Sequence, residues 1–426
     1  MKKVSPAAWV GSLYFAESLP YQMVCVFFLL LLAELGFDNA TVAFWSSLVT
    51  WPWAFKAFWA PALDVRGRKK SWIVFFEIAM GAAMIAAVSF CGFENPLLPL
   101  CGIFMLTAFM SSSHDIAADG YYIEVLPASE QAFYCGWRST FYRLGTIGVN
   151  GGLVAAVGWA AGFCASRNFP EISAWQAGLG TAGAVMLLLG IWHWCLLPAS
   201  PSAGASRPVL AGLWEAFAAF FRKKQVCRAI VFILLFRLAE ALLGKISPLF
   251  LTDDPSRGGI GLSTAEYGVI YGTIGVSCLI AGGIISGMVV CRFGLGKTLF
   301  PMALALNLPD LGYLWLAMVQ PESRLAVGGI IAVEQLGYGF GMTAFMLYMA
   351  SFVEDSGPFR SSHYAFLTGF MAIGMIVPGM AAGYLQSLAG YTGFFALVMA
   401  ATLPAMAVIP LVKGSYRGDF GSVEKR

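Results

Sequence analysis

Ionisable side chains stand in the middle of long apolar segments of this chain, where a charge is costly. Segment 97–124 carries His114, Asp115 and Asp119, and the next segment, 132–162, carries two arginines. A charged group near the centre of a bilayer costs about 2.5–3.5 kcal/mol on insertion scales. Such groups are retained mainly where they pair with one another or line a path for ions and solutes. The pattern therefore predicts a polar pathway inside a membrane protein.

Asp115 and Asp119 are four residues apart and share one face of a helix, and Arg138 and Arg143 lie at matching depths in the next helix. One interpretation pairs Asp115 with Arg143 and Asp119 with Arg138, which locks the hairpin. In the other, an acid titrates during transport while an arginine binds an anionic substrate or tunes the acid's proton affinity. The two are compatible. His114 points about 100° away from its neighbour Asp115, so it is either a proton relay or a hydrogen-bonded core histidine.

Glu17 lies near the middle of the first apolar segment and is our first candidate for proton binding. It is followed by Pro20, which leaves a backbone carbonyl without its helical donor and favours a kink. Such a break suits a helix that must rock around a central site.

Further charges occupy the second and seventh segments. Lys56 lies too deep to reach the headgroups easily, so we expect a partner inside the bundle. Glu240 is the counterpart of Glu17, and Arg237 stands one turn away, where it either neutralises Glu240 or serves the pathway. Lys245 is placed to hold an anionic group or to snorkel. We predict that Lys56, Arg138, Arg143, Arg237, Glu240 and Lys245 serve substrate binding, and that Glu17, His114, Asp115 and Asp119 serve proton coupling. Two further internal acids, Asp310 and Glu334, have no partner that the sequence assigns.

The composition explains why these charges need positioning by membrane helices. The chain is 59% hydrophobic and 12% charged, with a mean hydropathy of +0.74, whereas soluble domains average about 25% charged residues. Continuous apolar runs longer than about 17 residues predict spanning helices rather than barrel strands. There are twelve such runs: 8–35, 41–62, 71–92, 97–124, 132–162, 174–197, 227–251, 263–290, 298–319, 325–351, 361–387 and 391–412.

Basic residues predict the orientation of these spans. Of the 26 Lys and Arg residues, eighteen fall in the segments that are cytoplasmic if the N-terminus is inside, three in the opposite loops, and five within spans. This imbalance predicts that both termini are cytoplasmic. Lys2 and Lys3 precede an apolar stretch too long for a cleavable signal, so the first span is expected to anchor the chain. The net charge of +3 gives no reason to expect nucleic acid.

The chain divides near its midpoint. We predict an N-terminal six-helix bundle over 1–197, a cytoplasmic linker with an interfacial helix over 198–226, a C-terminal six-helix bundle over 227–413 and a tail over 414–426. The halves repeat weakly, because the loop 64–70 has a degenerate copy at 291–297. Two six-span halves are one plan of secondary transporters.

The loop 64–70 carries Asp64, Gly67 and Arg68 and resembles the loop signature of the major facilitator superfamily. Its carboxylate would face arginines at neighbouring helix ends, where contacts form and break, and we predict that it gates transport. A plain basic cytoplasmic loop is the simpler alternative. The second copy has Cys291 where the family usually has an acid, which weakens any such role there.

Three longer stretches resemble the AmpG-like muropeptide permeases within that superfamily. Tyr14–Pro20 is similar to their first-helix G-L-P segment, Phe55–Asp64 to their K-x-x-W-A-P-x-x-D, and Ser113–Tyr121 to their Q-D-I-x-x-D-A/G-Y. Near the C-terminus, Tyr364–Leu367 and Gly383–Phe395 also match. The resemblance places Lys56, Asp115 and Asp119 on family motif positions and implies twelve spans, the bacterial inner membrane and proton-driven import. The chain departs from the pattern at Ser18 and His114.

We therefore expect an all-α membrane protein with the major facilitator fold, acting as a permease that imports a polar anionic solute such as a muropeptide with protons. A siderophore or metal chelate is the alternative cargo, and a membrane receptor or sensor is the alternative outside transport. No nucleophile–base set supports an enzyme. The nine scattered cysteines and three histidines give no disulfide framework, metal site or cofactor. The expected partners are a small-molecule substrate, protons and lipid, with the protein a monomer.

Asp115 gives the first test. The substitution Asp115→Asn removes the titrating group, so we expect it to abolish uptake driven by an imposed pH gradient while the protein stays inserted in the membrane. Uptake and membrane content would be measured together. Normal uptake by this variant would remove Asp115 from the mechanism.

Overall fold

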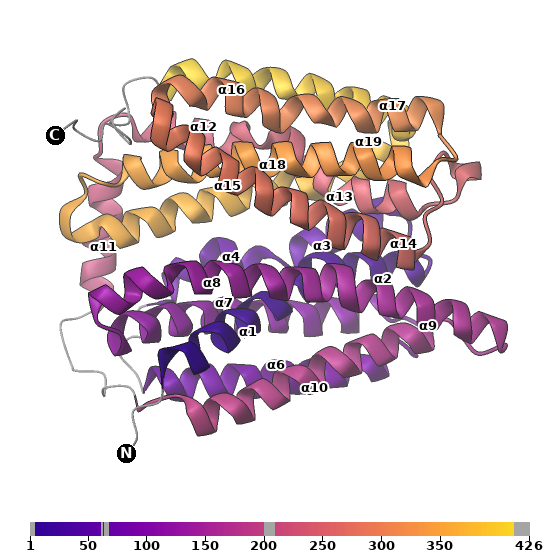
Figure 1. The fold of residues 1–426 in the computed structure, drawn as a ribbon, viewed down its shortest axis with the longest axis horizontal. Coiled ribbons are helices and arrows are strands. Elements are labelled where there is room, and N and C mark those ends of the chain that lie inside the picture. The colour runs from indigo at the N-terminus through magenta and orange to yellow at the C-terminus, as the bar shows by residue number, and fades with distance from the viewer. Residues whose placement is uncertain (1–4, 61–62, 64–67, 200–208, 413–426) are drawn as a thin grey trace. The chain divides into compact units, whose positions relative to one another are not determined.

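The computed structural model describes residues 5–60, 63, 68–199 and 209–412, and within these ranges the secondary structure is helical, with no strand. The described residues form two compact units (Figure 1). The first unit contains Met1–Phe37, Val49–Gly212 and Thr264–Gly268, and the second contains Asp38–Leu48, Leu213–Ser263 and Val269–Arg426. The all-helical prediction is confirmed. The predicted domain limits stay a prediction.

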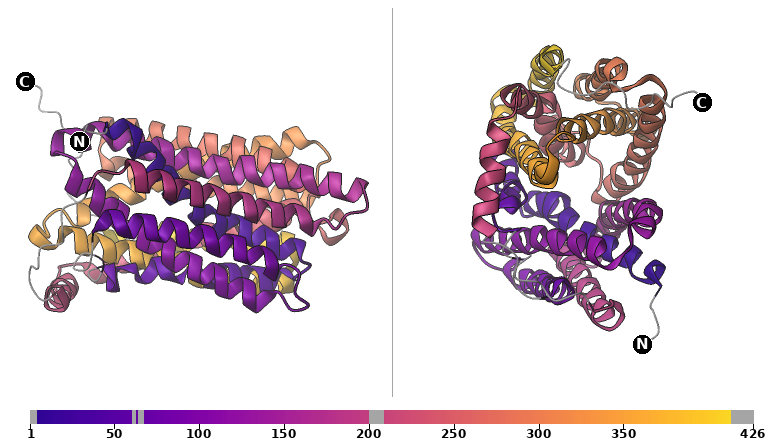
Figure 2. Two further views of the ribbon diagram at one scale, coloured as in Figure 1. Left: turned by 90° about the horizontal axis from the view of Figure 1, so that it is seen from below. Right: turned by 90° about the vertical axis from the view of Figure 1, so that its left-hand side faces the viewer.

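Long helices that run side by side build the first unit, as Figures 1 and 2 show. Its elements are η1 (Pro6–Ala8), α1 (Val10–Gln22), η2 (Met23–Phe27), α2 (Phe28–Glu34), α4 (Trp51–Phe55), η3 (Lys56–Phe58), α6 (Lys69–Phe90), α7 (Leu97–Val125), α8 (Ala128–Ile147), η4 (Gly148–Leu153), α9 (Val154–Ser166), α10 (Ile172–Leu196) and α14 (Thr264–Tyr267).

The second unit has a similar helical build. Its elements are α3 (Asn39–Leu48), most of α11 (Val209–Phe221), α12 (Val226–Phe236), α13 (Leu238–Thr252), η5 (Pro255–Arg257), η6 (Gly268–Gly275), α15 (Val276–Phe293), α16 (Leu295–Asn307), η7 (Leu308–Asp310), α17 (Leu311–Val319), α18 (Arg324–Phe352), η8 (Gly357–Phe359), α19 (Arg360–Ala407) and η9 (Ile409–Val412). The helix α3 packs on α13 and α19, and Asp38 just before it accepts hydrogen bonds from Thr41 that hold the pKa of Asp38 below its usual value.

Within the described ranges, nine helical segments are long and apolar enough to cross a membrane. One of them, Ser362–Val412, spans 51 residues and bends at Gly390, whose φ of 65° and ψ of 176° are non-helical, so it supplies two predicted spans. The second and seventh predicted spans are helical but interrupted. The second breaks between α3 and α4, and the seventh breaks at Arg237, with φ −110° and ψ 22°. Each of the twelve predicted runs therefore has a helical counterpart.

Aromatic packing joins the two helices, α1 and α7, that carry all four predicted proton-coupling residues. Trp9, just before α1, and Tyr14 on α1 meet Tyr121 and Tyr122 of α7 edge to face, with ring centroids 5.2 and 5.9 Å apart. All four side chains are buried. Helical bonding changes to a π-turn at η2, directly after the segment that contains Pro20. The α1–α7 contact thus fixes the helix upstream of that change.

Glycines set the spacing of α15 and α18 in the second unit. A Cβ atom on Gly282 would lie 2.0 Å from the Leu336 carbonyl oxygen, and one on Gly339 would lie 2.0 Å from the Leu279 carbonyl oxygen. These reciprocal contacts bring the two backbones close together, which is a common way for membrane helices to gain packing energy without a hydrophobic driving force.

We predict that Gly339→Ala destabilises the second unit, because the new methyl group forces α15 and α18 apart. Overpacking of this kind costs about 1–3 kcal/mol. The matched control is Gly329→Ala on the same helix, where a Cβ atom would meet nothing within 4 Å. The thermal unfolding midpoint in one detergent should fall for the first variant and stay the same or rise for the control. Equal midpoints would contradict the tight crossing.

Candidate functional site

Two ion pairs join the predicted site residues of the first unit. The Lys56 ammonium donates to Asp115 Oδ2 at 2.5 Å, and Arg138 Nη2 donates to Asp119 Oδ1 at 2.6 Å. Lys56 begins the short 3₁₀ turn η3, at the point where α4 ends, so the break in the helix carries a charge. Both acids lie on α7 and Arg138 lies on α8.

Glu17 joins the same group from α1. Its carboxyl lies within electrostatic range of the Asp115 carboxyl, and its Oε2 atom is buried without a hydrogen-bond partner among the described residues. Two neighbouring carboxylates repel each other, so a proton bound by one of them is stabilised. We call Glu17, Lys56, Asp115, Asp119 and Arg138 the carboxyl cluster. Its three acids and two cations leave one negative charge that a single proton neutralises.

Tyrosines orient the Arg138 end of the carboxyl cluster. Tyr14 Oη donates to Asp119 Oδ1 at 2.9 Å, and the Arg138 guanidinium lies over the rings of Tyr14 and Tyr122, at 4.3 and 5.1 Å from their centroids. The Asp119 side chain nevertheless keeps 47% of its surface exposed, and that of Lys56 keeps 30%. These charges are positioned by neighbours yet remain within reach of a solute.

One of the two predicted pairs is present and the other is wrong. Asp119 pairs with Arg138 as expected, whereas the partner of Asp115 is Lys56 and not Arg143. Arg138 and Arg143 are five residues apart, so they point about 140° away from each other at 3.6 residues per turn. Depth alone matched both arginines to α7, but only one of them can face it. Arg143 is half-buried and forms no ion pair with a described residue.

His114 is a hydrogen-bonded core histidine in this structure. Its Nε2 lies 3.2 Å from Glu77 Oε1, and Nδ1 of His193 lies 2.7 Å from the same oxygen. All three side chains are fully buried. Sequence reasoning missed Glu77 and His193. The available signal was an acid and a histidine, each in the interior of an apolar segment.

The second unit gathers its own acids. Glu240 on α13, Asp310 on η7 and Glu334 on α18 are buried and lie close enough to repel one another when charged. Asp310 is 1% exposed, and neither of its carboxyl oxygens has a hydrogen-bond partner among the described residues. Arg237, at the α12–α13 break, lies within electrostatic range of Glu240 and donates to Tyr338 Oη at 2.6 Å. Asp310 and Glu334, to which the sequence assigned no partner, thus lie near the predicted substrate-binding residues Arg237 and Glu240.

The remaining predicted residues lie elsewhere. Lys245 donates to the Ser46 carbonyl oxygen at 3.1 Å and so ties α13 to α3. In the predicted gating loop, Asp64 and Gly67 lie outside the described residues, and Arg68 is exposed at the start of α6. Next to it, the buried Lys69 forms an ion pair with Glu124 at the end of α7, at 3.4 Å. A charged contact between helix ends is therefore present beside this loop.

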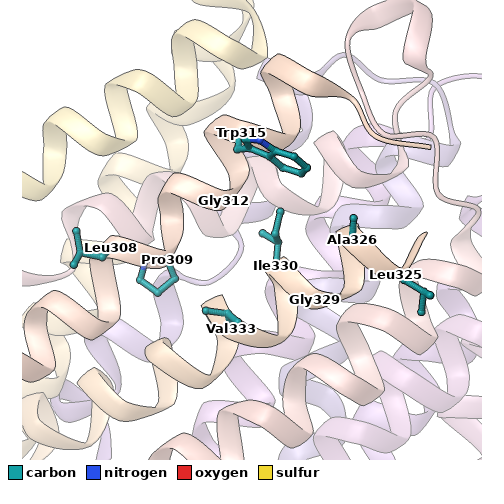
Figure 3. Close-up of a pocket in the computed structure, with 9 residues that line it drawn as sticks. All are labelled: Leu308, Pro309, Gly312, Trp315, Leu325, Ala326, Gly329, Ile330 and Val333. Carbon is teal, nitrogen blue, oxygen red and sulfur yellow. The ribbon is translucent and has the colours of Figure 1, made fainter. Parts of the chain in front are cut away.

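A hollow of about 540 Å³ opens on the second unit between η7, α17 and α18 (Figure 3). Apolar side chains and glycines line it: Leu308, Pro309, Gly312, Trp315, Leu325, Ala326, Gly329, Ile330 and Val333. Several of these side chains are well exposed, as expected of a surface that faces hydrocarbon. None of the predicted site residues that the structure describes lines it, so we do not assign it to the transported solute.

Comparisons with known proteins agree with this architecture. The family description Major Facilitator Superfamily matches residues 10–359. The chain belongs to the major facilitator superfamily. An anhydromuropeptide permease of Escherichia coli K12 is 26% identical over 383 residues, covering 87% of this chain and 72% of that protein. A putative transporter AmpG 4 of Rickettsia conorii is 23% identical over 395 residues, covering 89% of each.

Solved structures give the same fold. The nucleoside transporter NupG superposes with a TM-score of 0.71 at 15% identity, covering 95% of this chain and 98% of that one. The twelve-span fold and the AmpG-like resemblance are confirmed. The chain is a multi-pass membrane transporter with a small-molecule substrate, and its relatives are permeases rather than enzymes.

The Lys56–Asp115 pair makes a double-mutant prediction. Lys56→Met alone should destabilise the protein, because it leaves the acids without their cation, whereas Lys56→Met combined with Asp115→Asn removes both charges. We expect the free energies of unfolding to couple by about 0.5–3 kcal/mol. Thermal unfolding of the four proteins in one detergent measures this. Lys297→Met, at an exposed lysine, is the control, and strictly additive effects would contradict the pair.

Proposed function

We propose that this transporter imports an anionic sugar-peptide of the muropeptide type together with protons, across the inner membrane of a bacterium. The observation that carries the proposal is the Glu17–Asp115 carboxyl pair beside Lys56. A proton bound between two acids next to a lysine gives a site whose charge changes on protonation. Within this proposal the protein acts as a monomer with both termini in the cytoplasm.

Coupling follows from competition for Lys56. While Asp115 is ionised, it holds the ammonium at 2.5 Å. Protonation of the carboxyl pair weakens that hold and frees Lys56 for a substrate carboxylate, so proton and anion bind together. Release of the proton on the other side restores the Lys56–Asp115 pair and displaces the anion. Lys56 thus exchanges Asp115 for the substrate carboxylate. In this proposal, that exchange is what makes the site open to the other side of the membrane.

The surroundings of Arg138 support an anionic substrate. Its guanidinium is 31% exposed and is held in place by Asp119, Tyr14 and Tyr122. A fixed guanidinium that keeps part of its surface exposed binds carboxylates well. The printed name of the Escherichia coli relative, anhydromuropeptide permease, supports the same class.

The test is uptake of a labelled N-acetylglucosaminyl-anhydro-N-acetylmuramyl peptide by the purified protein in liposomes. An inward pH gradient should accelerate uptake by the wild type. Glu17→Gln should lose this acceleration but retain exchange of labelled for unlabelled solute, which needs no net proton movement. The cation control is Lys297→Met, which should behave as wild type.

Three outcomes would overturn the proposal. Uptake whose rate does not depend on the pH gradient would rule out proton coupling. Uptake of a ferric hydroxamate chelate in preference to the muropeptide assigns a metal-chelate importer instead. If the Glu17→Gln variant behaves as wild type in both gradient-driven uptake and solute exchange, the carboxyl pair has no part in the mechanism.

A further inference from the structure

Three titratable side chains of the first unit meet away from the carboxyl cluster. We call Glu77 on α6, His114 on α7 and His193 on α10 the histidine cluster. Glu77 Oε1 lies 3.2 Å from His114 Nε2 and 2.7 Å from His193 Nδ1, and no part of the three side chains is exposed. Ser12 on α1 closes the group, because its Oγ lies 2.9 Å from His193 Nε2.

The hydrogen bonds show which ring can hold an extra proton. Ser12 Oγ lies 3.2 Å from the Trp9 carbonyl oxygen, so the Ser12 hydroxyl can donate there while its oxygen accepts from an N–H at His193 Nε2. Nδ1 of the same ring lies 2.7 Å from Glu77 Oε1, which accepts when Glu77 is ionised. Both nitrogens of His193 can therefore donate at once, as in an imidazolium.

His114 has the opposite arrangement. Its Nε2 donates to Glu77, while its Nδ1 is buried without a hydrogen-bond partner among the described residues. A second N–H at that position would be a buried donor with nothing among the described residues to accept it, which costs free energy. Of the two rings, His193 is therefore the one that offers an acceptor to each N–H of an imidazolium. One negative and one positive charge then balance in a dry interior, whereas two neutral histidines would leave the Glu77 charge uncompensated.

We propose that the histidine cluster is a second proton-binding site of this transporter, with its proton carried by His193. Its distinguishing feature is that proton occupancy sets the direction of the bond to Ser12. When His193 loses the proton, its Nε2 becomes an acceptor, and Ser12 must turn its hydroxyl away from Trp9 to satisfy it. The site thus links protonation to the first turn of α1, the helix that also carries Glu17.

The charged groups around the histidine cluster are few. Asp115 follows His114 on α7 and is held by Lys56. From α6, Lys70 donates to the Leu197 carbonyl oxygen just past the end of α10, at 2.6 Å. From α1, the facing group is the hydroxyl of Ser12. Glu77 is therefore the charged group that faces His193 directly.

The test uses the fact that the chain has three histidines. The full-length protein, labelled with ¹⁵N in its imidazole rings and held in lipid nanodiscs, would be studied by NMR at about pH 8, where an ordinary histidine is neutral. We expect one doubly protonated ring and two neutral ones. The doubly protonated signal should vanish in His193→Gln, and in Glu77→Gln it should become a neutral ring, because the counter-charge is gone.

His363 is the internal control, since it lies in the second unit and bonds to the Ala216 carbonyl oxygen at 3.1 Å. His363→Gln should remove one neutral signal and leave the doubly protonated ring unchanged. Ser12→Ala is the milder variant if Glu77→Gln does not fold, and it should make the proton on His193 exchange faster with solvent.

Three neutral rings in the folded wild type would overturn the proposal, as would a doubly protonated ring that survives His193→Gln. Because the NMR measurement needs no substrate, its result is independent of the proposed muropeptide transport. A protein that shows the imidazolium but fails the uptake assay retains the second proton site and loses the proposed function.

Discussion

Every polar group that lies within an apolar bundle needs a partner, and in this protein that constraint decides where helices break. The second span gives way to a 3₁₀ turn at Lys56, the seventh breaks at Arg237, and α16 ends before η7, which contains Asp310. A helix break exposes backbone groups that only other protein groups or a water-filled cavity can satisfy. These three helix breaks thus coincide with ionisable side chains, because the same polar surroundings satisfy the free backbone groups and the charge.

Each unit gathers more acidic side chains within its helices than nearby basic side chains neutralise. The carboxyl cluster of the first unit has one acid more than its cations, and the acids of the second unit outnumber Arg237. The histidine cluster differs, because it is sealed and balanced within itself. The first two arrangements suit groups that change charge during a cycle. The third arrangement, the histidine cluster, suits a proton that stays bound and holds the first turn of α1 in place through Ser12.

Much of this was predictable from the sequence. Twelve apolar runs, the depth of Glu17 and the i,i+4 spacing of Asp115 and Asp119 led to the right helices and the right family. The partner of Asp115 was not predictable from depth, since depth leaves the rotation of a helix undefined and the turn that aims Lys56 at α7 has no strong signal. Glu77 and His193 were missed for a related reason. Each stands alone in its segment, and only the packing of α6 against α7 and α10 brings them together.

The apolar hollow of the second unit has a consequence for the membrane around the protein. Pro309 lines it, and the next residue is the buried Asp310 (Figure 3). Any fatty-acyl tail that fills the hollow packs against the same short turn that carries this acid. A lipid tail in the hollow would therefore be one peptide bond away from a buried acid of the protein.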